Sequence, residues 1–228
     1  MTALFITGTG TDVGKTFVAL ALIAALRAQG RKVCAVKPVA SGFDPAAPEA
    51  SDSGRLLRAL GRPLDGAALA SVSPWRFAAP LSPDMAAARE GRRIDFDELV
   101  RFSARSEESD SAAEVTLIEG IGGVMVPLDE RHTVLDWIEA LRVPVLLVAG
   151  TYLGTLSHTL TAVHALESRG CAPAAVVLSE SLEQPVPAEE TQRVLRRFIG
   201  VRVDVLGRQT ADEAAGSRAL RKLIASVL

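Results

Sequence analysis

Cysteine is scarce in this chain. Only Cys34 and Cys171 occur among the 228 residues, and they do not have the spacing of metal ligands. The sequence therefore offers no cysteine-based metal site and no disulfide framework. Because both residues lie beside apolar runs, we expect two buried, reduced thiols in a cytoplasmic protein.

The chain also lacks an excess of basic charge, a signal segment and a membrane-length apolar run. Its 25 lysine and arginine residues are balanced by 27 acidic residues, which gives a formal net charge of −2. Nucleic-acid binders usually carry a basic surface, so we expect no nucleic-acid partner. Lys15 interrupts the one early apolar stretch, and no run approaches the ~20 residues of a membrane span. We therefore expect neither secretion nor membrane attachment.

The stretch from Gly8 to Thr16, with the sequence GTGTDVGKT, carries the most specific chemistry in the chain. It follows an apolar run at residues 3–6 and precedes a long apolar pattern, so it lies at a strand-to-helix turn, where a phosphate-binding loop belongs. Glycines let backbone N–H groups surround phosphate oxygens there, and the helix N-terminus adds a positive dipole. Lys15 is expected to reach the outer phosphates, and the Thr16 hydroxyl to bind Mg²⁺.

This loop departs from the strict phosphate-loop pattern at one position. The pattern places a glycine five residues before Gly14, where this chain has Thr9, and glycines stand instead at Gly8 and Gly10. We interpret the stretch as a variant loop that is one residue longer from Gly8. The alternative is a turn that only joins a strand to a helix, but the Gly-Lys-Thr at the helix start favours nucleotide binding.

Two further predicted strands end in polar residues. Residues 32–39 contain the start of the segment KPVASG, and residues 115–118 lead into the segment EGIGG. In an open parallel sheet, ligands gather at the carboxyl ends of strands, so Lys37, Ser41 and Glu119 are expected to face the phosphate loop. A solvated lysine, an ordinary turn serine and an incidental glutamate are the alternatives that the sequence leaves open.

Strand and helix patterns alternate along the chain. This alternation predicts one domain, residues 1–228, with the α/β fold of a phosphate-loop (P-loop) NTPase, in which a parallel β-sheet carries helices on both faces. Ser51 or Asp52 is expected to cap a helix near residues 56–60, and Asp52 is alternatively a metal ligand. The other expected helices are residues 17–28, 94–106, 134–141, 153–169, 187–199 and 217–227, the expected strands are 3–6, 32–39, 115–118, 145–149, 174–178 and 203–206, and residues 61–83 and 107–114 are expected to be a long loop and a solvated linker.

Three separated segments, GTGTDVGKT, KPVASG and EGIGG, occur in an order and spacing that resembles the dethiobiotin synthetase family. KPVASG is the most specific of them, because a generic phosphate-loop ATPase has no need of it. The resemblance runs over most of the chain, and it also includes Ser51-Asp52, the segment PLSP at residues 80–83 and the turn at residues 153–158.

The resemblance implies an ATP-dependent ligase of biotin biosynthesis that closes a cyclic urea. One amine of 7,8-diaminopelargonic acid takes up CO₂ as a carbamate, and ATP converts the carbamate into a mixed anhydride with phosphate. The second amine then closes the ring, and dethiobiotin, ADP and phosphate leave. Such a transfer needs charge neutralised on two anions, which two lysines across the γ-phosphate would supply.

The resemblance also assigns catalytic and substrate-binding roles. Lys15 would hold the phosphates, and Lys37 would be the catalytic lysine near the carbamate and the γ-phosphate. Thr11 and Ser41 would contact the end of the substrate that reacts. Members of the family are homodimers with the site near the interface, so the partner subunit's copy of one turn would receive the substrate carboxylate at a helix N-terminus. That turn consists of Gly154, Thr155, Leu156 and Ser157.

ATP and Mg²⁺ are the cofactors that the resemblance implies. Thr16, Asp52 and Glu119 would complete an oxygen-rich shell around the metal ion, with water in the remaining places. The residues implied to contact the nucleotide are Asp12, Val13, Gly14, Lys15, Thr16, Phe17, Glu119, Gly120, Ile121, Gly122 and Ser179.

The chain departs from the family at several positions. Ser179 stands where an asparagine usually reads the adenine edge, and Gln209-Thr210 stands where an Ile-Pro pair is usual. These two departures leave the strictness of ATP over other nucleotides open. Asp84 replaces a common histidine and Ser157 a common asparagine, in the parts of the family's site that hold the substrate tail.

Two other interpretations compete with this one. Amidoligases of the cobyric acid type share a similar nucleotide domain, but they carry a glutaminase domain with a catalytic cysteine, for which this chain leaves no room. A partner-acting nucleotide-switch ATPase of the chromosome-partitioning type would explain the phosphate loop. Such loops usually carry an additional lysine near their start, which is missing between Gly8 and Gly14, and a switch gives no reason for KPVASG.

Overall fold

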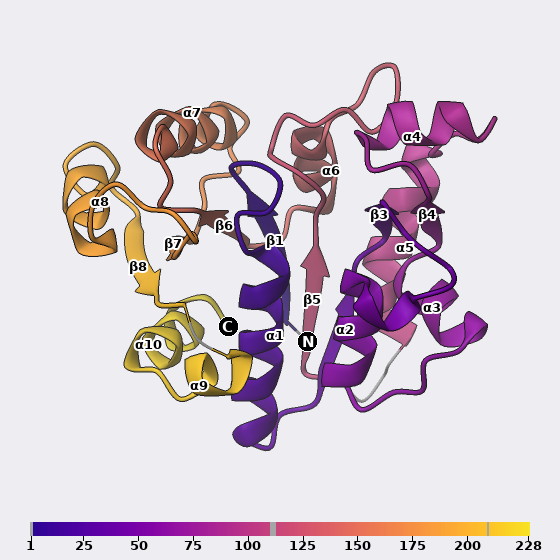
Figure 1. Ribbon diagram of the computed structural model, residues 1–228, viewed down its shortest axis with the longest axis horizontal. Coiled ribbons are helices and arrows are strands. Elements are labelled where there is room, and N and C mark those ends of the chain that lie inside the picture. Colours follow the sequence, from indigo (N-terminus) through magenta and orange to yellow (C-terminus); the bar gives the residue numbers. More distant parts are fainter. Residues whose placement is uncertain (1, 110–112, 209) are drawn as a thin grey trace.

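The computed structural model describes residues 2–109, 113–208 and 210–228. Its central sheet has six strands in the order β2-β5-β1-β6-β7-β8, and every neighbouring pair is parallel (Figure 1). The predicted phosphate-loop fold is thereby confirmed. The strands are β1 (Thr2–Gly8), β2 (Val33–Val36), β5 (Val115–Glu119), β6 (Val145–Ala149), β7 (Ala175–Ser179) and β8 (Arg202–Leu206).

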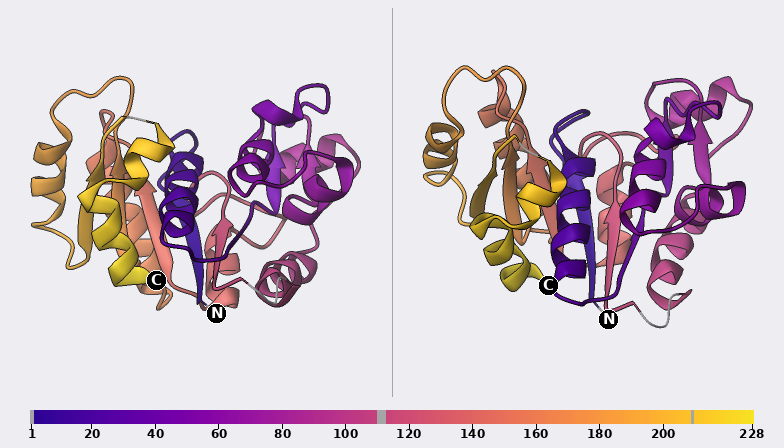
Figure 2. Two further views of the ribbon diagram at one scale, coloured as in Figure 1. Left: turned by 90° about the horizontal axis from the view of Figure 1, so that it is seen from below. Right: turned by 60° about the horizontal axis from the view of Figure 1, so that its bottom comes forward.

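Helices cover both faces of this sheet, because each strand sends alternate side chains to opposite faces. In β1, Leu4 and Ile6 pack into the core beneath α1 (Lys15–Ala28), whereas Phe5 packs into the core on the other face. Figure 2 shows α9 and α10 beside α1 on the first face. The other helices are α2 (Asp52–Ala59), α3 (Gly66–Val72), α4 (Pro83–Arg89), α5 (Phe96–Ser109), α6 (Val134–Leu141), α7 (Thr155–Ser168), α8 (Ala188–Leu195), α9 (Ala211–Ala215) and α10 (Arg218–Val227), with a 3₁₀ turn at Pro48–Ala50.

The prediction of one strand over residues 32–39 is wrong in its extent. The main-sheet strand β2 ends at Val36, and the chain then enters a separate short parallel pair, β3 (Val39–Ser41) with β4 (Trp75–Phe77). Pro38 has no N–H to donate to a ladder, which favours a break at this point. The break places Lys37 at the carboxyl end of the main sheet, as the functional argument required.

Residues 61–83 are not a long loop, because they contain α3 and β4. The Asp65 side chain accepts a hydrogen bond from Ala68 N at 2.8 Å and so caps α3. Helix α9 was not predicted, and it begins with a capping box between Thr210 and Glu213. Of the predicted linker at 107–114, residues 107–109 continue α5, and residues 110–112 lie outside the described residues.

The two cysteines differ from the prediction in their exposure. Cys34 and Cys171 form no disulfide, but both are partly exposed rather than buried. Across residues 2–109, 113–208 and 210–228, no helix combines the length and the apolar character needed to cross a membrane.

Ser51 begins α2 and thereby sets the position of Asp52. The Ser51 hydroxyl accepts a hydrogen bond from Gly54 N at 3.0 Å, so Ser51 and not Asp52 is the cap. Asp52 is the first residue of the helix, and its carboxylate is left to make other contacts.

Replacing Ser51 by alanine should lower the free energy of unfolding by about 1 kcal/mol, because the Gly54 N–H then loses its acceptor. Chemical denaturation followed by circular dichroism measures this change. Ser51→Thr is the matched control, since threonine keeps a capping oxygen and should lose clearly less. Equal losses in the two variants would show that the cap does not stabilise this helix.

Candidate active site

The phosphate loop joins β1 to α1, as predicted. Gly14 is the N-terminal cap of α1 with φ +96°, and no side chain caps the helix. The N–H groups of the first turn are therefore available to an anion, and the helix dipole favours one. Asp12 also has a positive φ, +58°, which is uncommon for a residue other than glycine and is typical of functional loops.

Close packing explains the glycines at the two ends of the loop. A Cβ on Gly8 would lie 2.9 Å from Val13 Cγ2, and a Cβ on Gly14 would lie 2.4 Å from Ser179 Oγ. Gly8 thus lets the loop fold back over the end of β1, and Gly14 lets it approach the end of β7. The strict motif has a glycine at the position of Thr9. In this loop the glycine stands one position earlier, at Gly8.

Lys37 lies at the centre of a buried cluster of charged and polar groups. Its Nζ donates a hydrogen bond to Glu119 Oε1 at 2.6 Å and lies 2.8 Å from Asp52 Oδ2. Thr16 Oγ1 donates to the same Glu119 oxygen at 2.6 Å. The four residues come from the end of β2, the start of α2, the end of β5 and the start of α1. The fold therefore brings together groups that lie up to 103 positions apart in the sequence.

Electrostatic contacts in this cluster favour the ionised forms of Lys37 and Asp52. Burial by itself lowers the pKa of Lys37, but the carboxylates of Glu119 and Asp52 outweigh burial and raise this pKa above its ordinary value. Burial by itself raises the pKa of Asp52, and the charge and hydrogen bond of Lys37 lower it overall. Lys37 is thus a fixed cation throughout the physiological pH range.

Lys15 lies in a different electrostatic environment. Its Nζ donates to Gly10 O at 2.7 Å, and the side chain makes no ion pair among the described residues. Burial, followed by the like charge of Lys37, lowers the pKa of Lys15 to about 8. Burial keeps water away from this ammonium, so a bound anion would stabilise its charge strongly. This is expected for a phosphate-binding lysine.

The residues proposed to hold a metal ion fit Mg²⁺. Glu119 Oε2 is buried and has no hydrogen-bond partner among the described residues, so one carboxylate oxygen is left for a further ligand. Thr16 and Asp52 add a hydroxyl and a second carboxylate. No three His, Cys, Asp or Glu side chains gather as metal ligands in the described part of the chain. A small set of hard oxygen donors is typical of Mg²⁺, which keeps several waters.

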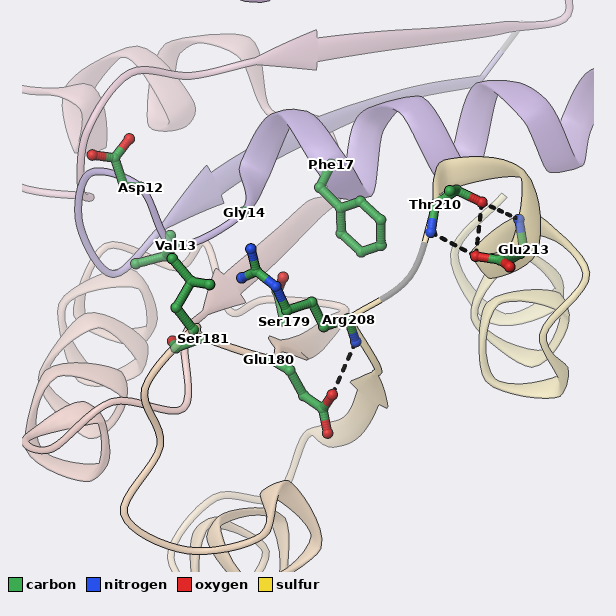
Figure 3. Close-up of a pocket in the computed structure, with 11 residues that line it drawn as sticks. Asp12, Val13, Gly14, Phe17, Ser179, Glu180, Ser181, Arg208, Thr210 and Glu213 are labelled. Carbon is green, nitrogen blue, oxygen red and sulfur yellow. Dashed lines mark hydrogen bonds between the residues drawn. The ribbon is translucent and has the colours of Figure 1, made fainter.

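Two adjoining pockets open around the phosphate loop. The Lys37 pocket has a volume of about 770 Å³ and the Arg208 pocket about 630 Å³. The first is lined by Thr11, Asp12, Gly14, Lys15, Thr16, Phe17, Lys37, Ala40, Ser41, Gly42, Phe43, Ala50, Ser51, Asp52, Arg55, Pro80, Leu81, Ser82, Pro83, Ile121, Gly122 and Val126. The second is lined by Asp12, Val13, Gly14, Phe17, Ser179, Glu180, Ser181, Leu182, Arg208, Thr210 and Glu213 (Figure 3).

Most predicted site residues line these pockets, and a few do not. Glu119 lies beneath the Lys37 pocket and reaches it through its contacts with Lys37 and Thr16. Gly120 is buried, and its N–H donates to Ile6 O, so it supports the site rather than lining it. The four residues of the predicted substrate-carboxylate turn line neither pocket. They are Gly154, Thr155, Leu156 and Ser157, at the uncapped start of α7.

The residues that replace the family's usual ones have mixed placements. The buried Ser179 lines the Arg208 pocket and lies against Gly14 of the phosphate loop. Thr210 lines the same pocket, whereas Gln209 lies outside the described residues. Asp84 lies in the first turn of α4, and its Oδ1 is buried without a hydrogen-bond partner in the described structure.

Sequence reasoning did not identify Arg208, Phe43 or Arg55 as site residues. Arg208 follows β8 by two positions, so the rule that ligands gather at the carboxyl ends of strands could have identified it. Phe43 and Arg55 follow the KPVASG segment and Asp52 closely. No local motif distinguishes them from ordinary loop and helix residues.

Comparison with known proteins identifies several relatives. Residues 2–208 match the family model described as an AAA domain. The chain is 54% identical over 201 residues to the ATP-dependent dethiobiotin synthetase BioD of Acidiphilium cryptum, covering 88% of this chain and 89% of the relative. It is 46% identical over 219 residues to the protein of the same name from Methylobacterium nodulans, covering 95% and 97%.

Solved structures with similar folds are more distant in sequence. The MinC:MinD cell division complex of Aquifex aeolicus has a chain with a TM-score of 0.56 and 12% identity, covering 100% of this chain and 98% of that one. The signal recognition particle receptor FtsY of Elizabethkingia anophelis has a TM-score of 0.54 and 17% identity, and this chain covers 65% of it. At these identities the likeness shows the fold alone, and it gives no support to the nucleotide-switch interpretation.

Proposed function

The chain belongs to the ATP-dependent dethiobiotin synthetase family, and we propose that it closes the ring of dethiobiotin in the Lys37 pocket. As a member of this family it is an ATP-dependent ligase. The observation that carries the proposal is the buried Lys37, held by Glu119 and Asp52 beside the phosphate loop. A lysine at this place gives a second fixed cation next to the site of phosphoryl transfer, beyond what nucleotide binding requires.

The reaction proceeds in three covalent steps. One amine nitrogen of 7,8-diaminopelargonic acid attacks the carbon of CO₂ and loses a proton, which leaves a carbamate. A carbamate oxygen then attacks the γ-phosphorus of ATP, the bond to the bridging oxygen breaks, and ADP leaves. Finally the second amine attacks the carbonyl carbon of the mixed anhydride and loses a proton, phosphate leaves, and the cyclic urea of dethiobiotin remains.

Lys37 and Lys15 neutralise the two anions that must approach each other. Both line the Lys37 pocket, and burial there makes each charge more effective than it would be in water. The Lys37 ammonium forms ion pairs with Glu119 and Asp52. We propose that it turns from these carboxylates toward the carbamate and the γ-phosphate, while Thr11 and Ser41 contact the reacting end of the diamine.

Thr16, Asp52 and Glu119 are proposed to hold Mg²⁺. The unpartnered Oε2 of Glu119 supports this role. When bound, Mg²⁺ neutralises phosphate charge and orients the triphosphate. Glu119 and Asp52 also balance the charge of Lys37. A cation held by these carboxylates would offset their charge when Lys37 turns toward the substrates.

The nucleotide is proposed to span both pockets. Its phosphates lie on the N–H groups at the start of α1, and its sugar and base extend into the Arg208 pocket. Asp12, Gly14 and Phe17 line both pockets and so lie along this path. The residues proposed to contact it are those named from the family resemblance, from Asp12 to Phe17, from Glu119 to Gly122, and Ser179.

A homodimer is proposed because one set of predicted substrate contacts lies away from the pockets of its own chain. The uncapped N-terminus of α7 is suited to a carboxylate, and Leu153 beside it is 86% exposed. The turn from Gly154 to Ser157 would then serve the partner subunit. We further propose a single domain over residues 1–228. The use of ATP supports a cytoplasmic location, which we also propose.

The activity is tested by measuring ADP release with Mg-ATP and bicarbonate, with and without 7,8-diaminopelargonic acid, while mass spectrometry follows dethiobiotin. The expected result is ADP release that depends on the diamine and matches dethiobiotin in amount. Omission of bicarbonate is the control for the carbamate step. ADP release that is indifferent to the diamine, with no cyclic urea, would contradict the proposal and favour a nucleotide switch.

ATP binding is expected to weaken above pH 8. In the free protein Lys15 loses its proton at about pH 8, whereas the bound triphosphate requires the ammonium and raises its pKa. Binding must therefore take up a proton above this pH, and the affinity for ATP falls by up to about tenfold per pH unit.

The same buried charge affects folding stability. Burial of the Lys15 ammonium opposes folding below about pH 8, and this penalty fades as the pH rises toward the ordinary lysine pKa.

Calorimetric titrations in buffers with different ionisation enthalpies measure this proton uptake. It should be close to zero at pH 7 and approach one proton at pH 9. Lys15→Arg is the matched control, because arginine stays charged and should bind ATP without the uptake. Uptake that persists unchanged in this variant would assign the proton to another group.

A further inference from the structure

We propose that Thr151 and Ser181 are positioning residues, which fix the side of the Arg208 pocket against which the sugar and base of ATP bind. Ser181 lines this pocket, whereas the fully buried Thr151 lines neither pocket. This inference rests on the proposed function, because it concerns the same bound nucleotide. It is carried by two hydrogen bonds between neighbouring loops, and by the scarcity of other bonds in one of those loops.

Thr151 and Ser181 form a reciprocal pair at the carboxyl end of the sheet. Each lies two positions beyond its strand, Thr151 after β6 and Ser181 after the neighbouring β7. The Ser181 N–H donates to Thr151 Oγ1 at 2.9 Å, and the Thr151 N–H donates to Ser181 Oγ at 3.0 Å. Each side chain therefore accepts a bond from the backbone of the other residue. Thr151 is 0% exposed, so water cannot readily replace a partner that is lost here.

The loop after β6, residues 150–154, has hydrogen bonds of its own. Thr155 Oγ1 donates to Gly150 O at 2.6 Å, and Thr155 N donates to Tyr152 O at 3.1 Å. A Cβ on Gly150 would lie 2.8 Å from Ser181 Oγ, so the glycine lets the two loops meet. The loop after β6 is thus held independently of Ser181, and it can serve as the anchor for its neighbour.

The loop after β7 is the part that needs this anchor. Residues 179–182 line the Arg208 pocket (Figure 3). Glu180 N donates to Leu206 O at 3.1 Å, which ties the start of the loop to β8. Beyond Ser181, residues 182–186 form no hydrogen bond with any described part of the chain. Ser181 is therefore the last residue that hydrogen bonds hold in place on this side of the pocket.

Loss of the reciprocal pair should affect the sugar and base of the nucleotide but not its phosphates. Lys15 and the start of α1 hold the phosphates in the proposed arrangement, and neither Thr151 nor Ser181 lines the Lys37 pocket. The phosphate loop packs against Ser179, which stays in the sheet through the ladder between β7 and β8. A loop that is no longer fixed must be ordered when the nucleotide binds, and this ordering reduces affinity.

Equilibrium binding of ATP and of inorganic tripolyphosphate to the full chain, each with Mg²⁺, tests this inference. Tripolyphosphate carries the phosphates without the sugar and base, so wild-type protein should bind ATP more tightly. Thr151→Val keeps the shape of the side chain but removes its hydroxyl. This variant should bind ATP about threefold to tenfold more weakly, the equivalent of one hydrogen bond, and tripolyphosphate within about twofold of wild type. Ser181→Ala should give the same pattern, and the double variant should lose less than the product of the two single losses.

Two variants control for the hydroxyl and for burial. Thr151→Ser keeps an acceptor for the Ser181 N–H and should bind ATP as wild type does. Thr159→Val removes the hydroxyl of another fully buried threonine, which lines neither pocket and has no hydrogen-bond partner among the described residues. It should change the affinity for neither ligand.

Steady-state kinetics separate this positioning role from a general effect on the fold. In Thr151→Val the KM for ATP should rise, whereas kcat should stay within about twofold of wild type, because the pair lies outside the Lys37 pocket. Equal weakening of ATP and tripolyphosphate, or ATP binding equal to that of wild type, would overturn the inference. The expected binding pattern without any dethiobiotin formation would contradict the proposed function and leave this inference intact.

Discussion

Replacing Lys37 with glutamine is expected to lower kcat by about a hundredfold to a thousandfold, or roughly 3 to 4 kcal/mol of transition-state stabilisation. Glutamine has a similar length and can still hydrogen-bond to Glu119, but it carries no charge. The phosphoryl group would then move between two anions with only Lys15 and the metal ion to neutralise them. ATP binding should remain nearly intact, because Lys15 and the loop N–H groups hold the phosphates.

The split between binding and turnover distinguishes a catalytic role from a structural one. Calorimetry should give an ATP affinity within about threefold of wild type, and dethiobiotin formation should fall as stated above. Lys32→Gln is the matched control, because Lys32 is an exposed lysine only five positions away. Turnover in Lys37→Gln equal to that of wild type would remove Lys37 from the mechanism. A parallel loss of ATP binding would assign it to the nucleotide site instead.

The sequence predicts the parts of this site whose chemistry is local. The Gly-Lys-Thr at a helix start requires only the order of a strand, a turn and a helix, and the structure has that order between β1 and α1. Glu119 is likewise predictable, since residues 115–118 form a fully buried run and the polar residue follows at once. Buried parallel strands give the strongest signals in the chain, because both of their faces are apolar.

Other parts depend on tertiary contacts that no local pattern records. The chain leaves the main sheet after Val36, and Val39 pairs with Trp75 of β4. No local pattern predicts this, because Val39 has the apolar character of a strand in the main sheet. Helix α3 is a short run of small residues that becomes helical by capping at Asp65 and by burial of Leu69 and Val72. The strand-end rule could have drawn attention to Arg208, two positions after β8, but the direction of its side chain across the pocket depends on the tertiary structure (Figure 3).

Replacing Glu119 with glutamine is expected to destabilise the metal-free protein by about 3 kcal/mol, the lower end of the cost of breaking a buried ion pair. Glu119 is 1% exposed and Lys37 is 5% exposed, so the ammonium cannot recover hydration when its partner is neutralised. Asp52 remains as a second partner at 2.8 Å, which keeps the loss from being larger. The free energy of unfolding from chemical denaturation measures the change.

Glu114→Gln is the matched control. The Glu114 carboxylate is exposed, and its ion pair with Arg31 at 3.7 Å contributes little to the free energy of unfolding.

A double-mutant cycle with Lys37→Met separates the pair from its surroundings. If the cost of Glu119→Gln comes from the stranded ammonium, removing the ammonium as well should recover much of it, so the two single losses should exceed the loss in the double variant. The same variants report on the metal, because Mg²⁺ should raise the thermal midpoint of wild type and of Lys37→Met but not of any variant that lacks Glu119. Additive losses, or stabilisation by Mg²⁺ that survives Glu119→Gln, would mean that Glu119 neither balances Lys37 nor binds the metal. Coupled losses together with a lost response to Mg²⁺ would mean that Glu119 serves both cations, so that a bound metal ion would compensate this carboxylate when Lys37 turns toward the substrates.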